Sequence, residues 1–374
     1  MKILHINCNY MDSWLHQNMI ETLDRLEVES KVFVPLYQLN GHIVKPNANV
    51  NPAVCFRKWD RIAYGYKQNK IIKRIKADYN VTEFSCLHAY TLFTDGNVAR
   101  SLYKEFNIPY VVAVRNTDVN DFFKRMIHLR STGIKVMKDA KAIFFLSKAY
   151  YEKVINTYVP REIREEIIRK SHIVPNGIDD FWHDNINEEK NNLQHKFEEK
   201  KIRLIYAGGI DKNKNIGLTC KAKQYLENQG YDLSFCVIGK IKDKSVYEEI
   251  KSSVEYHKPK AKEELINFYR SADVFVMPSH TETFGLVYAE AMTQGLPVLY
   301  TKGQGFDGQF DDGLVGFSIS DTDYTDVARK IVACIGDYDR LRNNCIQKVS
   351  KFKWDVICKE YVECYKKVVE NIVD

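Results

Sequence analysis

Short apolar β-type runs alternate with longer helical stretches from one end of the chain to the other, and this alternation leaves few folds open. It is typical of a parallel sheet whose strands are joined by crossover helices. We therefore predict an α/β protein. The expected strands lie near 2–7, 31–36, 84–88, 110–114, 142–146, 172–174, 202–207, 233–238, 274–277 and 297–300.

The alternation is interrupted once. A turn-forming Pro-Asn-Gly within residues 174–179 is followed by a polar segment rich in Asn, Glu and Lys at 184–201. A chain of 374 residues is also more than twice the length of a typical domain. We predict one domain over residues 1–180 and a second over 200–352. After the second domain, residues 353–374 have apolar side chains at spacings of three and four, which indicates a final helix.

Composition indicates a globular protein, with 45% hydrophobic and 28% charged residues. The nine cysteines are odd in number, scattered and without a Cys-x-x-Cys pair, which favours reduced thiols over a disulfide framework or a zinc site. The run Met1–Asn7 is too short for a signal peptide, and no apolar stretch approaches the ~20 residues that span a bilayer. We expect a cytoplasmic protein, soluble or at the inner face of the membrane.

Charge is unevenly distributed along the chain. Residues 1–178 hold 27 Lys/Arg and 17 Asp/Glu (net +10), against 28 and 32 in residues 179–374 (net −4). Within the first half, the stretch 57–76 carries eight basic residues and one acid, Asp60, with apolar residues interleaved. As a helix it could contact an anionic membrane, or pack its apolar stripe on the core with a solvated basic face. We expect no nucleic-acid partner.

The stretch from the strand near 274–278 into the following helix has the features of an anion site. The first N–H groups of a helix lack internal partners and carry partial positive charge. Gly285 allows a phosphate to approach the main chain, because it has no Cβ. Glu282 and Glu290 flank this point with carboxylates, which accept hydrogen bonds from sugar and ribose hydroxyls. The stretch therefore suits a nucleotide-sugar, although an ordinary strand–helix unit with solvated glutamates is the alternative.

A family resemblance strengthens this interpretation. Glu282 and Glu290 are separated by seven residues, with Phe284-Gly285-Leu286 between them, Pro278-Ser279 before them and Ala291-Met292 after them. This pattern resembles the retaining glycosyltransferases of family 4, the group 1 glycosyl transferases. The resemblance implies the GT-B fold, in which two Rossmann-like domains face each other across a cleft. The first would bind the acceptor and the second the donor, and the helix at 353–374 would return to the first domain.

The resemblance also implies a reaction. A hexosyl unit would pass, with retention of configuration, from a nucleotide-sugar to a hydroxyl of a glycan or lipid-linked acceptor, as in surface polysaccharide biosynthesis. The donor would be a co-substrate, and we expect neither a metal nor another cofactor. UDP-hexose is the favoured donor and GDP-mannose the next.

Donor-site residues are carried over from the motifs. The turn at Gly208 and Gly209 and the following Lys214 resemble the family loop whose arginine and lysine bind the donor diphosphate. Lys214 matches the lysine, whereas Gly209 stands in the place of the arginine. Lys212 could compensate for that missing charge.

The remaining donor-site assignments come from the stretch around Gly285. The N–H groups of Gly285 and Leu286, next to Phe284, would receive the diphosphate together with Lys214. Glu290 would bind the ribose and Glu282 would orient the sugar near its reacting carbon. We expect Glu282 and Lys214 to be the catalytic residues.

Five residues of the first half are candidates for the acceptor side: Asp12, His88, Tyr90, Arg115 and Asp118. Tyr90 stands where family members commonly have a histidine, so the role of that histidine does not transfer. Asp118 matches the family pattern and Arg115 departs from it. Arg115 could bind a phosphate or pair with Asp118, and Asp12 could instead cap a helix.

Three other functions remain open at this point. A nucleotide-sugar epimerase can share the fold. An inactive nucleotide-sugar-binding homologue would explain the departures at Tyr90 and Gly209. A non-catalytic sugar-binding protein of two α/β lobes is a third possibility, although it usually carries an export signal.

Overall fold

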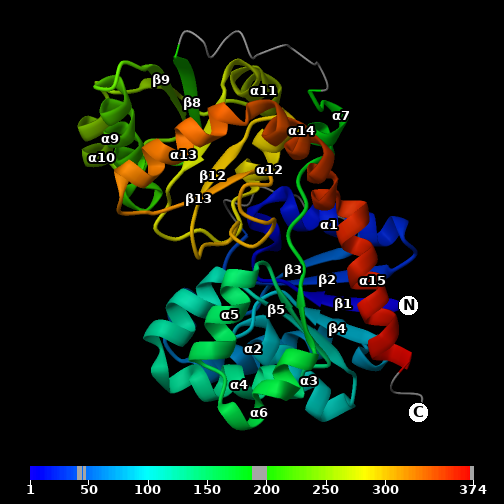
Figure 1. The fold of residues 1–374 in the computed structure, drawn as a ribbon. Helices are drawn as coiled ribbons and strands as arrows, with labels where there is room; N and C mark the ends of the chain where they lie inside the picture. The colour runs from blue at the N-terminus through cyan, green and yellow to red at the C-terminus, as the bar shows by residue number, and fades with distance from the viewer. Residues whose placement is uncertain (40–43, 45–47, 188–199, 371–374) are drawn as a thin grey trace. The chain divides into compact units, whose positions relative to one another are not determined.

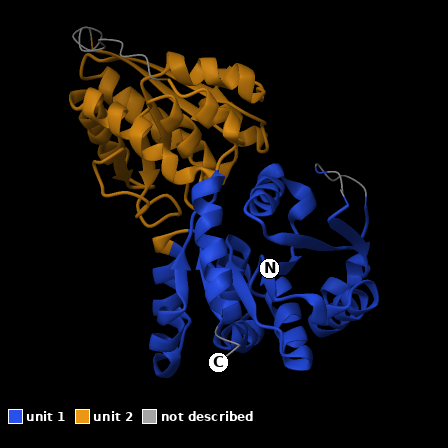
Figure 2. Cartoon of the chain, turned by 90° about the vertical axis from the view of Figure 1, so that its right-hand side faces the viewer, with its two compact units in different colours: residues 1–146, 150–177, 354–374 blue, residues 147–149, 178–353 orange. Residues whose placement is uncertain are grey.

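The structure, a computed structural model, describes residues 1–39, 44, 48–187 and 200–370. The chain forms two compact α/β units (Figures 1 and 2). Unit 1 comprises residues 1–146, 150–177 and 354–374, and unit 2 comprises residues 147–149 and 178–353.

Unit 1 contains a seven-stranded sheet in the order β3-β2-β1-β4-β5-β6-β7, and every paired strand in it runs parallel. The strands are β1 (Lys2–Ile6), β2 (Glu29–Leu36), β3 (Val50–Val54), β4 (Cys86–Ala89), β5 (Tyr110–Val114), β6 (Ala142–Phe145) and β7 (Ser171–Ile173). The helices are α1 (Trp14–Arg25), α2 (Tyr64–Asp78), α3 (Asp95–Phe106), α4 (Arg130–Asp139), α5 (Lys148–Thr157), α6 (Arg161–Arg169) and α15 (Trp354–Glu370).

Unit 2 contains a six-stranded parallel sheet in the order β10-β9-β8-β11-β12-β13. Its strands are β8 (Lys201–Ala207), β9 (Asp232–Ile238), β10 (Glu255–His257), β11 (Val274–Met277), β12 (Val298–Thr301) and β13 (Gly316–Ile319). Its helices are α7 (Asp180–Asp184), α9 (Ile216–Glu227), α10 (Lys244–Ile250), α11 (Lys262–Ser271), α12 (Leu286–Thr293), α13 (Tyr324–Gly336) and α14 (Tyr338–Lys348).

The predicted α/β class and its parallel sheets are confirmed, and each of the ten predicted strands is present. Three strands were not predicted: β3, β10 and β13. All three lie at the edge of a sheet. Edge strands are short and half-solvated, and β3 also contains Pro52, a residue that the sheet interior excludes. Their apolar patterns are therefore too weak to be recognised.

The last helix returns to unit 1, as the resemblance implies. In α15, the residues Trp354, Ile357, Tyr361, Tyr365 and Val368 are buried in a cluster with residues of the unit 1 sheet and α1. Figure 1 shows α15 (red) running past β1 and β4. In agreement with this position, α15 contacts α1 and β4.

A close approach fixes the first residue of α15. A Cβ on Gly177 would lie only 2.5 Å from the Trp354 ring, so the ring packs directly on the glycine backbone. The buried indole thus holds the start of the helix against the end of the 174–177 segment.

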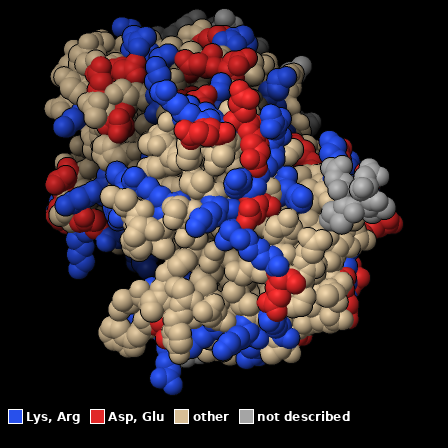
Figure 3. Space-filling view, turned by 90° about the horizontal axis from the view of Figure 1, so that it is seen from below, with Lys and Arg blue, Asp and Glu red and all other residues tan. Residues whose placement is uncertain are grey.

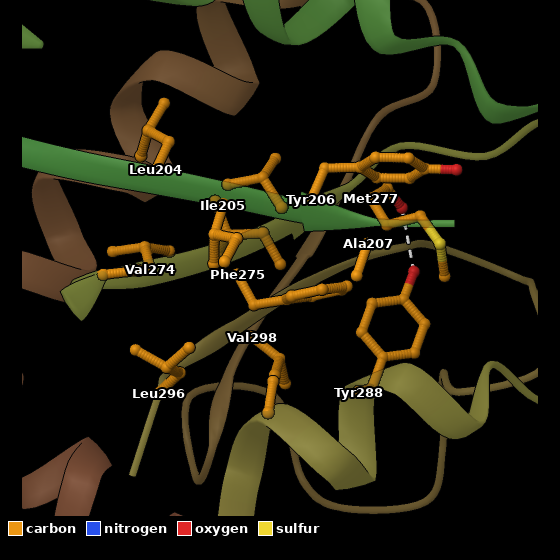
Figure 4. Packing of buried hydrophobic residues seen from close by; sticks show 14 of the residues in the cluster. Leu204, Ile205, Tyr206, Ala207, Val274, Phe275, Met277, Tyr288, Leu296 and Val298 are labelled. Atoms are coloured by element: carbon orange, nitrogen blue, oxygen red, sulfur yellow. Dashed lines mark hydrogen bonds between the residues drawn. The ribbon is translucent and has the colours of Figure 1, made fainter. Parts of the chain in front are cut away.

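The core of unit 2 lies on both sides of β8 and β11 (Figure 4). Phe275 of β11 packs edge to face against Tyr288 of α12, with ring centroids 5.5 Å apart. The Tyr288 hydroxyl donates to the Met277 carbonyl at 2.8 Å, a bond drawn in Figure 4. This buried bond fixes α12 against the C-terminal end of β11, where an open parallel sheet binds its ligands.

Charge on the surface is mixed. On the face drawn in Figure 3, basic and acidic side chains are intermixed between uncharged areas. Several residues of the basic stretch are also paired in the structure: Lys70 with Asp60, Arg74 with Asp78 and Lys76 with Glu105. Three of the eight basic side chains of the 57–76 stretch are therefore paired with acidic side chains.

Candidate active site

The candidate site begins where β8 ends, at the turn that carries Lys214. Gly208 has φ +153°, and its carbonyl oxygen would lie 1.7 Å from a Cβ on Gly239, so the turns after β8 and β9 touch through backbone. Asp211 then caps the short helix Lys212–Lys214, its carboxylate accepting from the Lys214 N–H at 3.2 Å. The glycines and the cap together determine where the Lys214 side chain starts.

Lys214 and Glu282 form an ion pair at the end of the unit 2 sheet. The Lys214 ammonium lies 2.5 Å from Oε2 of Glu282. The two side chains are 19% and 14% exposed, so the pair is largely shielded but still open to solvent. Two of the predicted donor-site residues, far apart in sequence, are thus in direct contact.

The loop that carries Glu282 is held by polar contacts to two other segments. Asn213 binds it from one side, accepting from the Thr281 N–H at 3.0 Å and donating to the Thr281 carbonyl at 2.8 Å. Gln304 binds it from the other side, its side-chain carbonyl accepting from the Glu282 N–H at 3.1 Å. The Glu282 carbonyl accepts from the Gly305 N–H at 2.9 Å. Three loops, each following a strand, therefore position one carboxylate.

Two glycines are required by this packing. A Cβ on Gly305 would lie 2.0 Å from the Thr283 carbonyl oxygen, so only glycine allows the 303–308 loop to approach the Glu282 loop. Gly285, with φ +78°, is the residue before α12, and a Cβ there would lie 2.5 Å from the Tyr288 ring and 3.3 Å from Cγ of Glu282. Gly285 therefore brings the start of α12 next to the Lys214–Glu282 pair.

Other residues of the predicted donor site have different positions. Phe284 is buried and packs against Phe306 and Phe352, so its contacts are those of a core residue. Leu286 begins α12 and is partly exposed. Gly209 follows Gly208, and its carbonyl accepts from the Tyr206 hydroxyl at 2.7 Å.

Glu290 lies in the second turn of α12, near a different charged pair. Burial raises the pKa of its carboxyl to about 7; nearby Asp179 also raises the pKa, and Lys262 opposes both effects. Lys262 and Asp179 themselves form an ion pair at 2.8 Å. A buried carboxyl with such a raised pKa is a candidate functional group.

The unit 1 candidates His88 and Tyr90 lie in the core. Both are buried, their rings stack with centroids 4.2 Å apart, and His88 Nδ1 lies 2.6 Å from the Tyr365 hydroxyl of α15. The Tyr90 hydroxyl lies 3.1 Å from Nδ1 of His5. Burial lowers the pKa of His88 well below its usual value, so the imidazole is neutral. In this structure both side chains contact other core residues of unit 1.

Asp118 and Arg115 are linked through backbone. The buried Asp118 carboxylate accepts from the N–H groups of Leu92, Phe93 and Arg115 at 2.8–3.1 Å. Burial raises its pKa to about 6, while these three bonds oppose the shift. The Arg115 guanidinium donates to the carbonyl of Tyr90 and to the side chain of Asn176. Asp118 therefore organises the turns after β4 and β5.

Asp12 is exposed, and the expectation that it caps a helix is wrong. The cap of α1 is Ser13, whose hydroxyl accepts from the Leu15 N–H at 3.3 Å. Ser13 rather than Asp12 has the extended backbone, with φ −160° and ψ 153°, that an N-cap requires.

Asn213 and Gln304, which hold the Glu282 loop, were not predicted from the sequence as site residues. Each lies in a loop, where periodicity carries no signal, and each acts on residues distant in sequence. Within residues 1–39, 44, 48–187 and 200–370, no group of three or more His, Cys, Asp or Glu side chains is placed to hold a metal ion. No helix in these ranges is long and apolar enough to cross a membrane.

The chain is similar to known proteins in sequence, and most clearly so in unit 2. Residues 187–352 match the family model described as "Glycosyl transferases group 1". A probable sucrose-phosphate synthase of Thermosipho melanesiensis is 26% identical over 311 residues, which cover 76% of this chain and 70% of that protein. The capsular polysaccharide biosynthesis glycosyltransferase CapM of Staphylococcus aureus is 27% identical over 60% of this chain and 61% of its own length. Other curated relatives match over 26–45% of their own length.

A solved structure agrees in fold. Anabaena Alr3699/HepE, in complex with UDP-glucose, superimposes with a TM-score of 0.67 at 16% identity, covering 98% of this chain and 100% of that one. The two parallel sheets therefore form the GT-B fold. The part of the chain that matches the group 1 glycosyl transferases, residues 187–352, lies in unit 2.

Proposed function

We propose that this glycosyltransferase transfers a hexosyl unit from a nucleotide-sugar to a hydroxyl, with retention of configuration at the sugar. The observation that carries the proposal is the contact of Lys214 with Glu282 beside Gly285 at the start of α12. This arrangement combines a cation, a helix N-terminus and a carboxylate within one set of loops. A cation and a helix N-terminus suit a diphosphate, and a carboxylate suits sugar hydroxyls.

In the proposed reaction the chain acts mainly by positioning and by stabilising the leaving group. The nucleoside diphosphate gains negative charge as the bond to the sugar breaks, so a fixed cation and fixed N–H groups lower the barrier. Lys214 and the first N–H groups of α12 would receive that charge without a metal. Glu282 would exchange its bond to Lys214 for hydroxyls of the sugar, and Glu290 would bind the ribose.

We propose UDP-hexose as the donor, with GDP-mannose as the second choice. Anabaena Alr3699/HepE, which shares the fold, was solved in complex with UDP-glucose, and this supports a UDP-sugar. The name of the CapM relative supports a role in surface polysaccharide biosynthesis and thus a glycan or lipid-linked acceptor.

We also propose that the protein acts in the cytoplasm and contacts an anionic membrane through the start of the 57–76 stretch. The apolar stripe of α2 faces inward, because Ile71 and Ile75 are buried in the core of unit 1. The preceding segment and the first turn of α2 differ: Trp59 and Ile62 are 77% and 82% exposed, and Tyr66 of α2 is 56% exposed.

Charge and geometry support this contact. The exposed Lys58 and Arg61 flank Trp59 and Ile62 in the chain, in and just after the short helix Lys58–Arg61. Large exposed apolar side chains among basic residues suit the interface of an anionic bilayer, where the rings enter the headgroup region and the cations attract the lipids.

A binding panel followed by a product assay tests the donor assignment. The melting temperature is measured with UDP-glucose, GDP-mannose, ADP-glucose and dTDP-glucose, since a ligand that binds the native state raises it according to affinity. We expect the largest shift with UDP-glucose. No shift with any nucleotide-sugar would contradict the proposal.

The product assay separates transfer from the alternatives. We expect release of UDP that depends on added acceptor and a product that keeps the anomeric configuration of the donor. An epimerase would convert the donor without acceptor, and an inactive homologue would bind the donor but release no UDP.

A further inference from the structure

The glycine turn after β8 is covered by the side chain of Lys242. A Cβ on Gly209 would lie 2.6 Å from Cε and 2.9 Å from Nζ of Lys242. The end of the lysine therefore occupies the space into which a side chain at position 209 would grow. A side chain at position 209 would have to displace the end of Lys242 from this turn.

Backbone contacts fix this relationship. Lys242 lies in the turn after β9, and its N–H donates to the Ile210 carbonyl at 3.0 Å. Ile210 and Ile241 also form a parallel bridge, so the two turns continue the pairing of β8 with β9. Both turns lie at the C-terminal ends of their strands, and the turn after β8 also carries Lys214.

Asp211 contacts both lysines. Its carboxylate lies 3.9 Å from Nζ of Lys242 and accepts from the Lys214 backbone N–H at 3.2 Å. The Lys242 side chain is 58% exposed and its distance to Asp211 is long for an ion pair. The ammonium of Lys242 is therefore placed beside the Lys214 turn yet accessible to a ligand.

We infer that Lys242 is the second cation of the diphosphate site, lying over Gly209 where the family loop has an arginine. The inference rests on the proposed function, because it assigns a residue to the same donor site. Glu282 already neutralises Lys214 before the donor binds, so a diphosphate needs further positive charge. Lys212 is also exposed, but the glycine turn is covered by Lys242.

Binding of UDP, measured by calorimetry, tests the inference. Lys242→Ala is expected to weaken UDP binding about tenfold and to reduce the dependence of the dissociation constant on salt, because one charge contact is lost. Lys242→Arg, which keeps the charge, is expected to stay within about threefold of the unchanged protein. Lys251→Ala removes a charge at the far end of α10, where Lys251 pairs with Glu248, and is the control expected to change neither quantity.

A compensating pair of substitutions separates a missing charge from a local distortion. In Gly209→Arg combined with Lys242→Ala, the arginine grows into the space vacated by the lysine. We expect this double variant to recover most of the lost UDP affinity, whereas Gly209→Ala with Lys242→Ala stays weak. A double variant with arginine that binds no better than Lys242→Ala would overturn the inference.

The two proposals fail in different ways. If the unchanged protein binds UDP and Lys242→Ala binds it within twofold as well, Lys242 is not part of the site, but the donor assignment stands. If the unchanged protein binds no nucleotide or nucleotide-sugar, the proposed function itself fails, and this inference fails with it.

Discussion

The ammonium of Lys214 and a carboxylate oxygen of Glu282 lie 2.5 Å apart although the two residues are 68 positions apart in the chain. Each side chain is held by its own loop, Lys214 through the Asp211 cap and Glu282 through Asn213 and Gln304. The pair is therefore pre-organised before any ligand binds. In the proposed reaction, a donor has to replace the bond between the two side chains with bonds of its own, which would couple recognition of diphosphate to recognition of sugar.

Loss of either partner should lower the rate of transfer. Lys214→Ala removes the cation that we propose receives the leaving group, and Glu282→Ala removes the carboxylate that we propose orients the sugar. We expect kcat/KM to fall by a factor of about 10²–10³ in each variant, measured as acceptor-dependent release of UDP.

The double variant Lys214→Ala with Glu282→Ala tests whether the two residues act as a unit. We expect its loss to be much smaller than the product of the two single losses, because residues in contact are not additive. Lys251→Ala is the matched control with an unchanged rate. Wild-type rates in both single variants would refute the assignment of the site.

Gly285 should be required for stability as well as for binding. Gly285→Ala introduces a Cβ at φ +78°, 2.5 Å from the buried Tyr288 ring. We expect the free energy of unfolding to drop by about 1–2 kcal/mol or more, measured by urea denaturation. Gly217→Ala is the control: a Cβ there meets no atom within 4 Å in the described parts of the chain, and alanine in α9 should stabilise by about 0.5–1 kcal/mol.

Glu290 should make stability depend on pH. Its folded pKa of about 7 lies above the ordinary value of 4.5, so the folded protein holds one more proton than the unfolded chain between these pH values. The stabilisation is complete below about pH 4.5 and is lost as the pH rises through 7, by at most about 3 kcal/mol.

Urea denaturation at pH 5 and pH 7.5 measures this effect. The unfolding free energy of the unchanged protein should be lower at pH 7.5 than at pH 5. In Glu290→Gln this decrease should be smaller, because the contribution of Glu290 is removed. Glu249 is exposed, so the variant Glu249→Gln should show the same decrease as the unchanged protein. An equal decrease in Glu290→Gln and in the unchanged protein would contradict this prediction.

Two tryptophans should differ sharply in their effect on stability. Trp354 is 2% exposed and packs on Gly177, so Trp354→Ala should lower the free energy of unfolding of unit 1 by about 3–5 kcal/mol. Trp59 is 77% exposed, and Trp59→Ala should change it by no more than about 0.5 kcal/mol. Equal effects in denaturant titrations would show that α15 is not anchored by Trp354.

The same exposed tryptophan should matter at a membrane. Replacing Trp59 and Ile62 together by alanine is expected to weaken co-sedimentation with phosphatidylglycerol vesicles at least about tenfold, because burial of each side chain contributes about 1.5–3 kcal/mol. Tyr324→Ala removes an exposed aromatic residue of unit 2 and is the control. Binding that is equally strong to neutral vesicles, or unaffected by the substitutions, would refute the membrane contact.

Prediction from sequence succeeded where one segment contains its own signal. The central strands have continuous apolar runs, and the stretch from Ser279 to Met292 combines a strand end, a glycine and a helix start. Edge strands were missed because half-solvated strands such as β3 have no such run. The assignment of α1's cap failed by one residue, since Asp12 and Ser13 are both good caps and only the backbone angles distinguish them.

The sequence by itself determined the class of fold, the candidate residues Lys214, Glu282 and Gly285, and the missing arginine at Gly209. Only the tertiary structure decided which of these residues meet and which others join them. Asn213, Gln304 and Lys242 reach their partners because parallel strands bring the ends of distant segments to one edge of a sheet. The same packing buries His88 and Tyr90 beneath α15. Contacts between segments so distant in the chain leave no periodic pattern in the sequence, so they become visible only once the sheets are assembled.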